Sequence, residues 1–250
     1  MAAIGPPANG TPLAFNIRMI VRIARLIRLF VLPLALSGAA AAASGLPAEA
    51  PPAPGVCAAM AENAEKTHRL PPQLLAAVAL AESGRWDADR QARIAWPWTV
   101  YAEGRGRYYD SKAEAIAEVE ALAAKGVRNI DVGCMQVNLK YHPDAFDDLE
   151  TAFDPSANAD YAARFLHELY KSRRSWGMAV AHYHSTTREH AVPYRKRVFA
   201  LWQDERRRAA EERRQANLAR MAERRAQYLA RQAERAARME ERRAALADAS

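Results

Sequence analysis

The residue best suited to acid–base chemistry is Glu82, the only acid in residues 72–84. Leu75, Val78 and Ala79 precede it at helical intervals, so a helix would place all four side chains on one otherwise apolar face. Burial raises the pKa of a carboxyl group, and the negative end of a helix dipole acts in the same direction. Such a group stays protonated near neutral pH and can act as a general acid. A solvated glutamate in the last turn of an ordinary helix explains the same pattern.

Two amides form a second candidate site. Gln136 and Asn138 interrupt the apolar residues at the end of segment 127–138. An amide side chain both donates and accepts hydrogen bonds, so each of these must find partners. The spacing does not choose between backbone partners and a polar ligand.

A metal centre and a nucleophilic triad are both disfavoured. His182, His184 and His190 lie close together, but no cysteine or carboxylate completes a zinc pattern, and helical residues two positions apart point apart. Ser83 has no histidine or aspartate arranged to activate it, so we expect it to hydrogen-bond locally or to orient Glu82. The sequence therefore predicts neither a metal nor a cofactor.

The elements that must position these residues are mostly helical. Pro71 and Pro72 suit the start of the helix that carries Glu82, and Gly84 suits its C-terminal cap. Other helices are expected at 56–67, 111–126, 146–150, from 154, and at 176–183 and 193–202.

One segment has β character. In residues 95–110, β-branched and aromatic residues flank Gly104-Arg105-Gly106, which predicts a β-hairpin. The aromatic side chains could stack on sugar rings, but packing of the hairpin onto the helices is favoured for most of them.

The net charge of +7 lies in the two ends of the chain. Residues 1–43 hold four Arg and no acid, and residues 203–250 hold 13 Arg against nine acids. Residues 44–202 are nearly neutral, with 19 basic residues against 20 acids, and give no reason to expect nucleic-acid binding.

The N-terminus predicts a secretory signal peptide over 1–43, with an apolar core at 29–36 and alanines at 39–43 for cleavage. Translation could start at Met19, which would leave a leader of ordinary length. The alternative is an uncleaved amphipathic anchor, the one route by which this end would hold the protein at a membrane. Residues 44–55 read as a linker, and we expect the chain to be exported to the periplasm.

Export bears on the two cysteines, Cys57 and Cys134. An even number of cysteines in an oxidising compartment suggests a disulfide, which would tie the first helix to the middle of the domain. Two buried free thiols are the alternative.

The tail, 203–250, is rich in Arg, Glu and Ala at helical intervals and predicts one long charged helix. Positions 218, 225, 232, 239 and 246 read Leu, Arg, Gln, Met and Leu, which makes a weak coiled coil at best. A solvated, partly frayed helix is favoured over a surface for anionic polymer or membrane.

Three short motifs together resemble the soluble lytic transglycosylase (SLT) catalytic domain, which is lysozyme-like. Residues 81–84 read Ala-Glu-Ser-Gly and match the Glu-Ser that ends the family's acid helix. Residues 133–138 match Gly-Leu-Met-Gln-Ile/Val-Asn with Cys134 in place of Leu. Residues 182–186 keep only the tyrosine of Ala-Tyr-Asn-Ala-Gly, and Tyr194 with Val198 resembles the late Tyr-x-x-x-Val.

The resemblance covers 56–202 and implies a mainly α, lysozyme-like helical domain with a small β-hairpin insertion, followed by the charged C-terminal helix. It implies cleavage of peptidoglycan between N-acetylmuramic acid and N-acetylglucosamine, with Glu82 as acid and then base. The residues implied to hold the glycan strand are Ser83, Met135, Gln136, Asn138, Tyr183 and Tyr194.

The family's route ends in a 1,6-anhydro ring and needs no second carboxylate. None is expected beside Glu82, because Asp87 and Asp89 fall in a loop. A hydrolytic muramidase on the same fold is one alternative. The other is a non-catalytic, peptidoglycan-binding assembly factor whose tail docks onto a cell-envelope secretion or motility complex.

Overall fold

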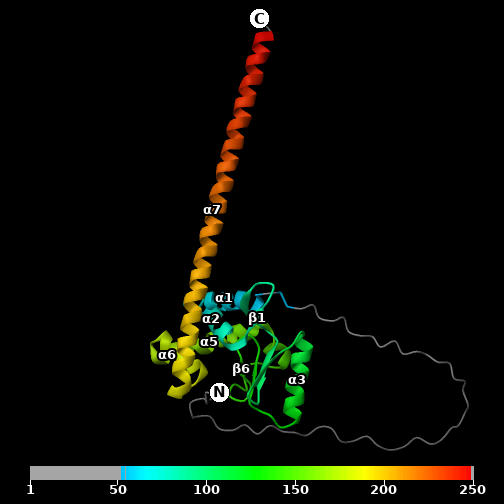
Figure 1. Ribbon diagram of the computed structural model, residues 1–250, viewed down its shortest axis with the longest axis vertical. Coiled ribbons are helices and arrows are strands. Elements are labelled where there is room, and N and C mark those ends of the chain that lie inside the picture. The colour runs from blue at the N-terminus through cyan, green and yellow to red at the C-terminus, as the bar shows by residue number, and fades with distance from the viewer. Residues whose placement is uncertain (1–51, 54, 249–250) are drawn as a thin grey trace, which may run out of the picture.

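The computed structural model describes residues 52–53 and 55–248, and the expected signal peptide lies outside them, as does most of the linker. The helices are α1 (Val56–His68), α2 (Leu74–Ser83), α3 (Lys112–Ala124), α4 (Leu149–Ala152), α5 (Pro155–Arg173), α6 (Trp176–His184) and α7 (Arg188–Asp248). The strands are β1 (Gly84–Asp87), β2 (Ala92–Ala95), β3 (Thr99–Ala102), β4 (Arg105–Tyr108), β5 (Ile130–Val132) and β6 (Val137–Asn138). The expected mainly α fold is confirmed (Figure 1).

Helices build one half of the domain. α1 packs on α5, α5 on α6, and both α2 and α6 on the first turns of α7. Their shared core is made largely of alanine, leucine and valine, and α2 is buried along almost its whole length. A disulfide joins Cys57 on α1 to Cys134 in the turn before β6, with Cα atoms 5.6 Å apart. This is the pairing that the sequence suggested.

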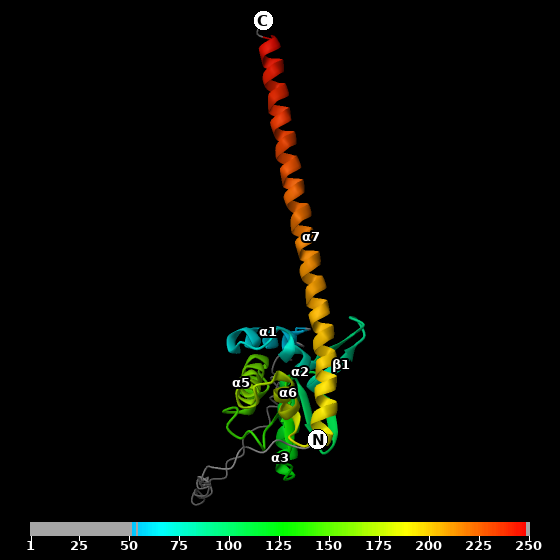
Figure 2. The ribbon, with the colours of Figure 1, turned by 90° about the vertical axis from the view of Figure 1, so that its left-hand side faces the viewer.

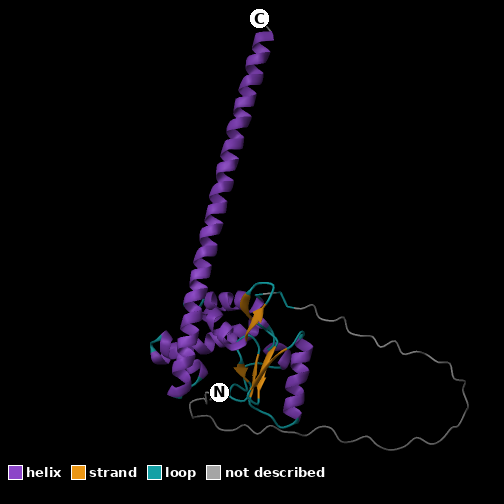
Figure 3. Cartoon of the chain, viewed as in Figure 1, coloured by secondary structure: helices purple, strands orange, loops and turns teal. Residues whose placement is uncertain are grey.

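A small antiparallel sheet builds the other half, in the strand order β4-β3-β5-β6. It lies beside α3 (Figure 3). The two pack through a second core that contains Trp96, Trp98 and Phe153. The expected hairpin at 95–110 is present as β3 and β4. Packing explains the two tryptophans, which are 7% and 4% exposed.

A second hairpin follows α2 directly. β1 pairs with β2 from Gly84↔Ala95 to Asp87↔Ala92, in a segment where the sequence predicted a loop. Gly84 does not form the left-handed cap that the sequence suggested, since its backbone is extended, with φ −65° and ψ 119°. Glycine is needed here for a steric reason. A Cβ atom at this position would lie 2.2 Å from the carbonyl oxygen of Leu80.

The N-terminus of α2 is capped from a distance. The helix begins at Leu74, two residues later than the prolines suggested, and Gln73 gives it no side-chain cap. Instead the buried Glu65 carboxylate of α1 accepts hydrogen bonds from the backbone N–H groups of Gln73, Leu75 and Ala76, at 2.7, 2.7 and 3.2 Å. These are donors that a helix start leaves unpaired.

α7 is one helix of 61 residues, about 92 Å long at the usual rise per residue. Its first turns pack against the domain, and the residues buried there are Ala191, Tyr194, Val198 and Glu205. From residue 210 to 248 every residue is exposed, and the helix extends away from the domain as a rod (Figure 2). Within the part of the chain that the structure describes, no helix has the length and apolar character to span a bilayer. The predicted domain boundary after Trp202 falls inside α7 and stays a prediction.

Candidate active site

Glu82 lies in the last turn of α2, where the helical half meets the sheet. The Tyr194 hydroxyl of α7 donates a 2.6 Å hydrogen bond to Glu82 Oε1. Tyr194 is buried, whereas Glu82 is partly exposed. The carboxyl group is therefore fixed on one side by a phenol and remains within reach of solvent.

The surroundings of Glu82 favour its protonated form. Burial raises the pKa of Glu82 from 4.5 to about 7. The hydrogen bond from Tyr194 opposes this rise, the negative charge of Asp131 adds to it, and the positive charge of Arg197 lowers the pKa. A carboxyl group that is half ionised near neutral pH can both give up and take back a proton during one reaction cycle.

Asp131 is the second carboxylate of the site, contrary to the expectation that none would be found there. It lies on β5, opposite Tyr101 of β3 and Asn138 of β6. Burial raises its pKa to about 6, although the hydrogen bond that it accepts from Asn138 Nδ2 at 2.6 Å acts in the opposite direction. Its neighbours Ile130 and Val132 are buried, so strand alternation turns Asp131 to the other face. The alternation of apolar and polar residues at 130–132 is the sequence feature that indicates this orientation of Asp131.

Tyrosines from α6 and α7 complete the surroundings of Glu82. The Tyr183 hydroxyl donates to the Met135 carbonyl oxygen at 2.9 Å. Desolvation raises the pKa of this partly buried phenol, and the charge of Glu82 raises it further. The Tyr194 ring stacks on His184, with centroids 4.4 Å apart and an interplanar angle of 8°. Burial lowers the pKa of His184 to about 4, so its ring is neutral at pH 7. His184 thus packs on the ring of Tyr194, whose hydroxyl group binds Glu82.

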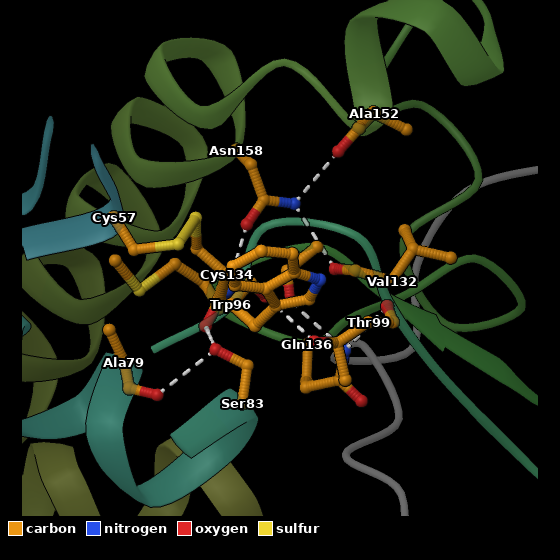
Figure 4. Close-up of a disulfide and its surroundings, with 12 residues drawn as sticks. Cys57, Ala79, Ser83, Trp96, Thr99, Val132, Cys134, Gln136, Ala152 and Asn158 are labelled. Carbon is orange, nitrogen blue, oxygen red and sulfur yellow. Dashed lines mark hydrogen bonds between the residues drawn. A yellow bond between two sulfur atoms is a disulfide. The ribbon is translucent and has the colours of Figure 1, made fainter. Parts of the chain in front are cut away.

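Two predicted glycan-binding side chains are buried instead. Ser83 and Met135 are both fully buried. The Ser83 hydroxyl donates to the carbonyl oxygens of Ala79 and Cys134, at 3.2 and 2.7 Å, and so fixes α2 to the turn before β6 (Figure 4). Consecutive helix residues point about 100° apart, so with Glu82 at the surface Ser83 points inward. Ser83 and Met135 are therefore part of the buried core beneath the site.

Gln136 and Asn138 differ in how many of their hydrogen-bonding groups already have partners. Gln136 has φ 48° and donates through Nε2 to the carbonyl oxygens of Thr99 and Gly133, each at 3.0 Å. Both of its N–H donors are thereby used, which leaves its oxygen for a ligand. Asn138 bonds Asp131 and Asn129 through Nδ2 and accepts from the N–H groups of residues 140 and 141. It holds Asp131 in place.

Asn158 of α5 was not singled out from the sequence, although it fixes the whole turn at 132–136. It is fully buried, accepts from the Met135 N–H at 2.8 Å, and donates to the carbonyl oxygens of Val132 and Ala152 (Figure 4). A Cβ atom on Gly133 would lie 2.3 Å from Asn158 Nδ2. An asparagine inside an alanine-rich helical stripe was the signal for a buried amide.

The site can therefore carry out acid–base chemistry, with one carboxyl group poised near neutral pH and a second one electrostatically coupled to it. In the part of the chain that the structure describes, no group of three or more His, Cys, Asp or Glu side chains is placed to hold a metal ion. Neither the curated proteins nor the solved structures with which the chain was compared gave a match. The family model described as the transglycosylase SLT domain matches residues 59–198. Because this match covers more than half of the 250 residues and includes Glu82, Asp131 and Tyr194, the chain belongs to the transglycosylase SLT domain family.

Proposed function

We propose that this protein is a lytic transglycosylase that cleaves the β-1,4 bond between N-acetylmuramic acid and N-acetylglucosamine. Membership of the SLT family links the chain to peptidoglycan in general. The observation that carries the finer proposal is the carboxyl group of Glu82, which is partly exposed, hydrogen-bonded to Tyr194 and has a pKa of about 7.

In the first step, protonated Glu82 gives its proton to the glycosidic oxygen. The bond between that oxygen and C1 of the muramic acid breaks, N-acetylglucosamine leaves with a free hydroxyl group, and C1 becomes oxocarbenium-like. The burial that raises the pKa of Glu82 supplies the protonated acid at neutral pH. The Tyr194 hydroxyl then stabilises the carboxylate that is left behind.

In the second step, the 6-hydroxyl group of the same muramic acid attacks C1 and gives its proton to the Glu82 carboxylate. A 1,6-anhydro ring forms, no water is consumed, and Glu82 returns to its starting state. A negative charge on Asp131 would stabilise the oxocarbenium-like centre if the sugar ring lies between the two carboxyl groups.

Hydrolysis by a muramidase is the second candidate, and Asp131 is the observation that favours it. A hydrolytic glycosidase normally uses a second carboxylate as nucleophile or to activate water. Asp131 is partly buried, fixed by Asn138 and close enough to Glu82 to raise its pKa. The two reactions differ in the new chain end, which is a 1,6-anhydro ring in one and a reducing sugar in the other.

The masses of the products distinguish these candidates. Purified sacculi would be digested with the wild-type protein, with Glu82→Gln and with Glu120→Gln, whose side chain is exposed on α3. The proposal predicts muropeptides one water lighter than hydrolysed ones, from the wild type and Glu120→Gln but not from Glu82→Gln.

Three other outcomes would count against the proposal. Reducing ends that are lost in Asp131→Asn would indicate the muramidase. Equal digestion by wild type and Glu82→Gln would remove Glu82 from the chemistry. Intact glycan with every protein, combined with binding to sacculi, would favour the non-catalytic assembly factor.

We further propose that the chain acts in the periplasm after removal of residues 1–43, with 56–202 as the catalytic domain and 203–250 as a separate functional segment. Peptidoglycan is the substrate class that the family implies, and the N-terminal sequence has the features of an export signal. N-terminal sequencing of the protein recovered from the periplasm should begin near Ser44. Recovery of the intact N-terminus in the membrane fraction would instead support an uncleaved anchor.

A further inference from the structure

The part of α7 beyond the domain has a charge pattern that the catalytic site does not use. Its residues 210–248 are all exposed. Six large apolar side chains of this segment are exposed, and three of them, Met221, Tyr228 and Met239, are 67%, 62% and 55% exposed. The arrangement of charge around these three residues indicates what the helix can bind.

Seven arginines form one stripe along this segment. The intervals between successive members are seven, four, seven, four, three and four residues, so the side chains share one face of the helix. Among the described residues, no acid lies within ion-pairing distance of any of them. The members of this arginine stripe are Arg213, Arg220, Arg224, Arg231, Arg235, Arg238 and Arg242.

These three residues lie along one edge of the arginine stripe. Met221, Tyr228 and Met239 each stand three residues before a member of the stripe, and residues three apart are neighbours on a helix surface. Arg225 and Arg243, four residues after the two methionines, flank the apolar residues on their other side. One side of the helix therefore carries a row of apolar groups between two rows of guanidinium groups.

Four acids of this segment form a row on the side opposite the apolar residues. Glu223 and Glu241 each follow one of the methionines by two residues, which is about 200° around the helix. Glu212 and Glu234 continue this row at intervals of 11 residues from Glu223. The apolar row is thus flanked by arginines, whereas this acid row lies on the far side of the helix from the apolar groups and borders the other edge of the arginine stripe.

We propose that residues 213–242 of α7 bind along the surface of a lipid bilayer that contains anionic headgroups. The arginine rows match the headgroup charge, and the side chains of Met221, Tyr228 and Met239 reach the boundary of the acyl chains between them. An anionic wall polymer would offer no apolar phase to these three residues. A closed dimer with a second copy through this face would bring arginine against arginine.

The test uses the full chain and two kinds of vesicle, phosphatidylcholine alone and phosphatidylcholine with phosphatidylglycerol. Hydrogen exchange would locate the contact, and flotation would measure partition. The proposal predicts slower exchange in peptides from 213–242 with the anionic vesicles only. No change in those peptides would overturn it, even if another part of the chain binds.

Matched variants make the partition measurement specific. Replacing Arg224, Arg231, Arg235 and Arg238 by Gln should weaken partition by at least about one hundredfold, since each arginine near such a surface contributes roughly fivefold. The control removes the same charge from exposed residues of the domain: Arg105, Lys125, Arg128 and Arg173 to Gln. Equal weakening in both would overturn the proposal, because only net charge would then matter.

A third variant separates a bilayer from other anionic partners. Replacing Met221, Tyr228 and Met239 by Ser keeps every charge and should weaken partition about tenfold or more, because the apolar contact is lost. Tight binding to soluble polyglutamate with no binding to vesicles would replace the bilayer with an acidic protein partner. None of these measurements depends on the catalytic activity.

Discussion

Replacing Glu82 by Gln should make the protein more stable above neutral pH. Ionised Glu82 is held where burial disfavours its charge, and among the described residues Tyr194 alone forms a hydrogen bond with it. Gln keeps the shape of the side chain and an oxygen that accepts the Tyr194 hydrogen bond, but it carries no charge. The variant therefore removes the desolvation cost and leaves the packing intact.

The size of this effect follows from the two pKa values. The pKa is about 7 in the fold against an ordinary 4.5, a difference of about 2.5 pH units, or about 3 kcal/mol. Because the folded-state pKa is the higher one, the contribution of Glu82 to stability is fully present below about pH 4.5 and is lost as the pH rises to about 7. Glu82→Gln should match the wild type at pH 4 and exceed it by about 3 kcal/mol at pH 8.

Urea unfolding at pH 4, 6 and 8, with the disulfide intact, would measure this difference. Glu120→Gln is the control, because this glutamate is exposed on α3 and its replacement should change the free energy of unfolding little at any pH. A stability difference between Glu82→Gln and wild type that does not change with pH would refute the reasoning. It would mean that Glu82 is solvated and has an ordinary pKa.

The remaining predictions concern the neighbours of Glu82 and the ends of α2. Tyr194→Phe removes a hydrogen bond that lowers the pKa of Glu82, so the alkaline limb of the pH–rate profile on sacculi should move up by about one to two units. Asp131→Asn removes a charge that raises the same pKa, so the limb should move down, and movement in the same direction for both would contradict the assignment. Glu65→Ala leaves three N–H groups of α2 without their acceptor and should lower the free energy of unfolding by about 3–5 kcal/mol in urea titrations, whereas a loss under about 1 kcal/mol would mean that water replaces it. Gly84→Ala would place Cβ 2.2 Å from a backbone carbonyl oxygen, so we expect little soluble folded protein, and a thermal midpoint equal to that of wild type would disprove this.

Local patterns predicted the helices and the place of Glu82. The helical spacing of apolar residues before Glu82 indicates a buried helix, and the helix expected at 111–126 begins where the Ser111 hydroxyl accepts a hydrogen bond from the N–H of Glu114. The hairpin at 99–108 follows from its turn residues. In each case, the residues that decide the element lie within it.

The parts of the site that the sequence did not reveal depend on contacts between distant segments. Asp131 approaches Glu82 because β5 pairs with β3 on one side and β6 on the other, and no local pattern specifies that register. Glu65 caps α2 from the preceding helix, and no pattern within α2 itself indicates this partner. Asn158 reaches the turn at 132–136 across the core.

Adjacency in sequence was misleading for Ser83. The motif places it beside Glu82, and the sequence therefore grouped both with the residues that meet the glycan. Successive residues of α2 point in different directions, so the Glu82 side chain is partly exposed whereas the Ser83 side chain is fully buried. The tail shows a similar limit: its helical character was predicted, but its continuity with the last helix of the domain was not.

The most direct measurement is an NMR titration of the Glu82 carboxyl carbon in protein labelled at glutamate side chains, with Glu82→Gln used to assign the signal. The structure predicts a midpoint at about pH 7. A midpoint below pH 5 would contradict it, because Glu82 would then be ionised at neutral pH and unable to supply the proton that breaks the glycosidic bond.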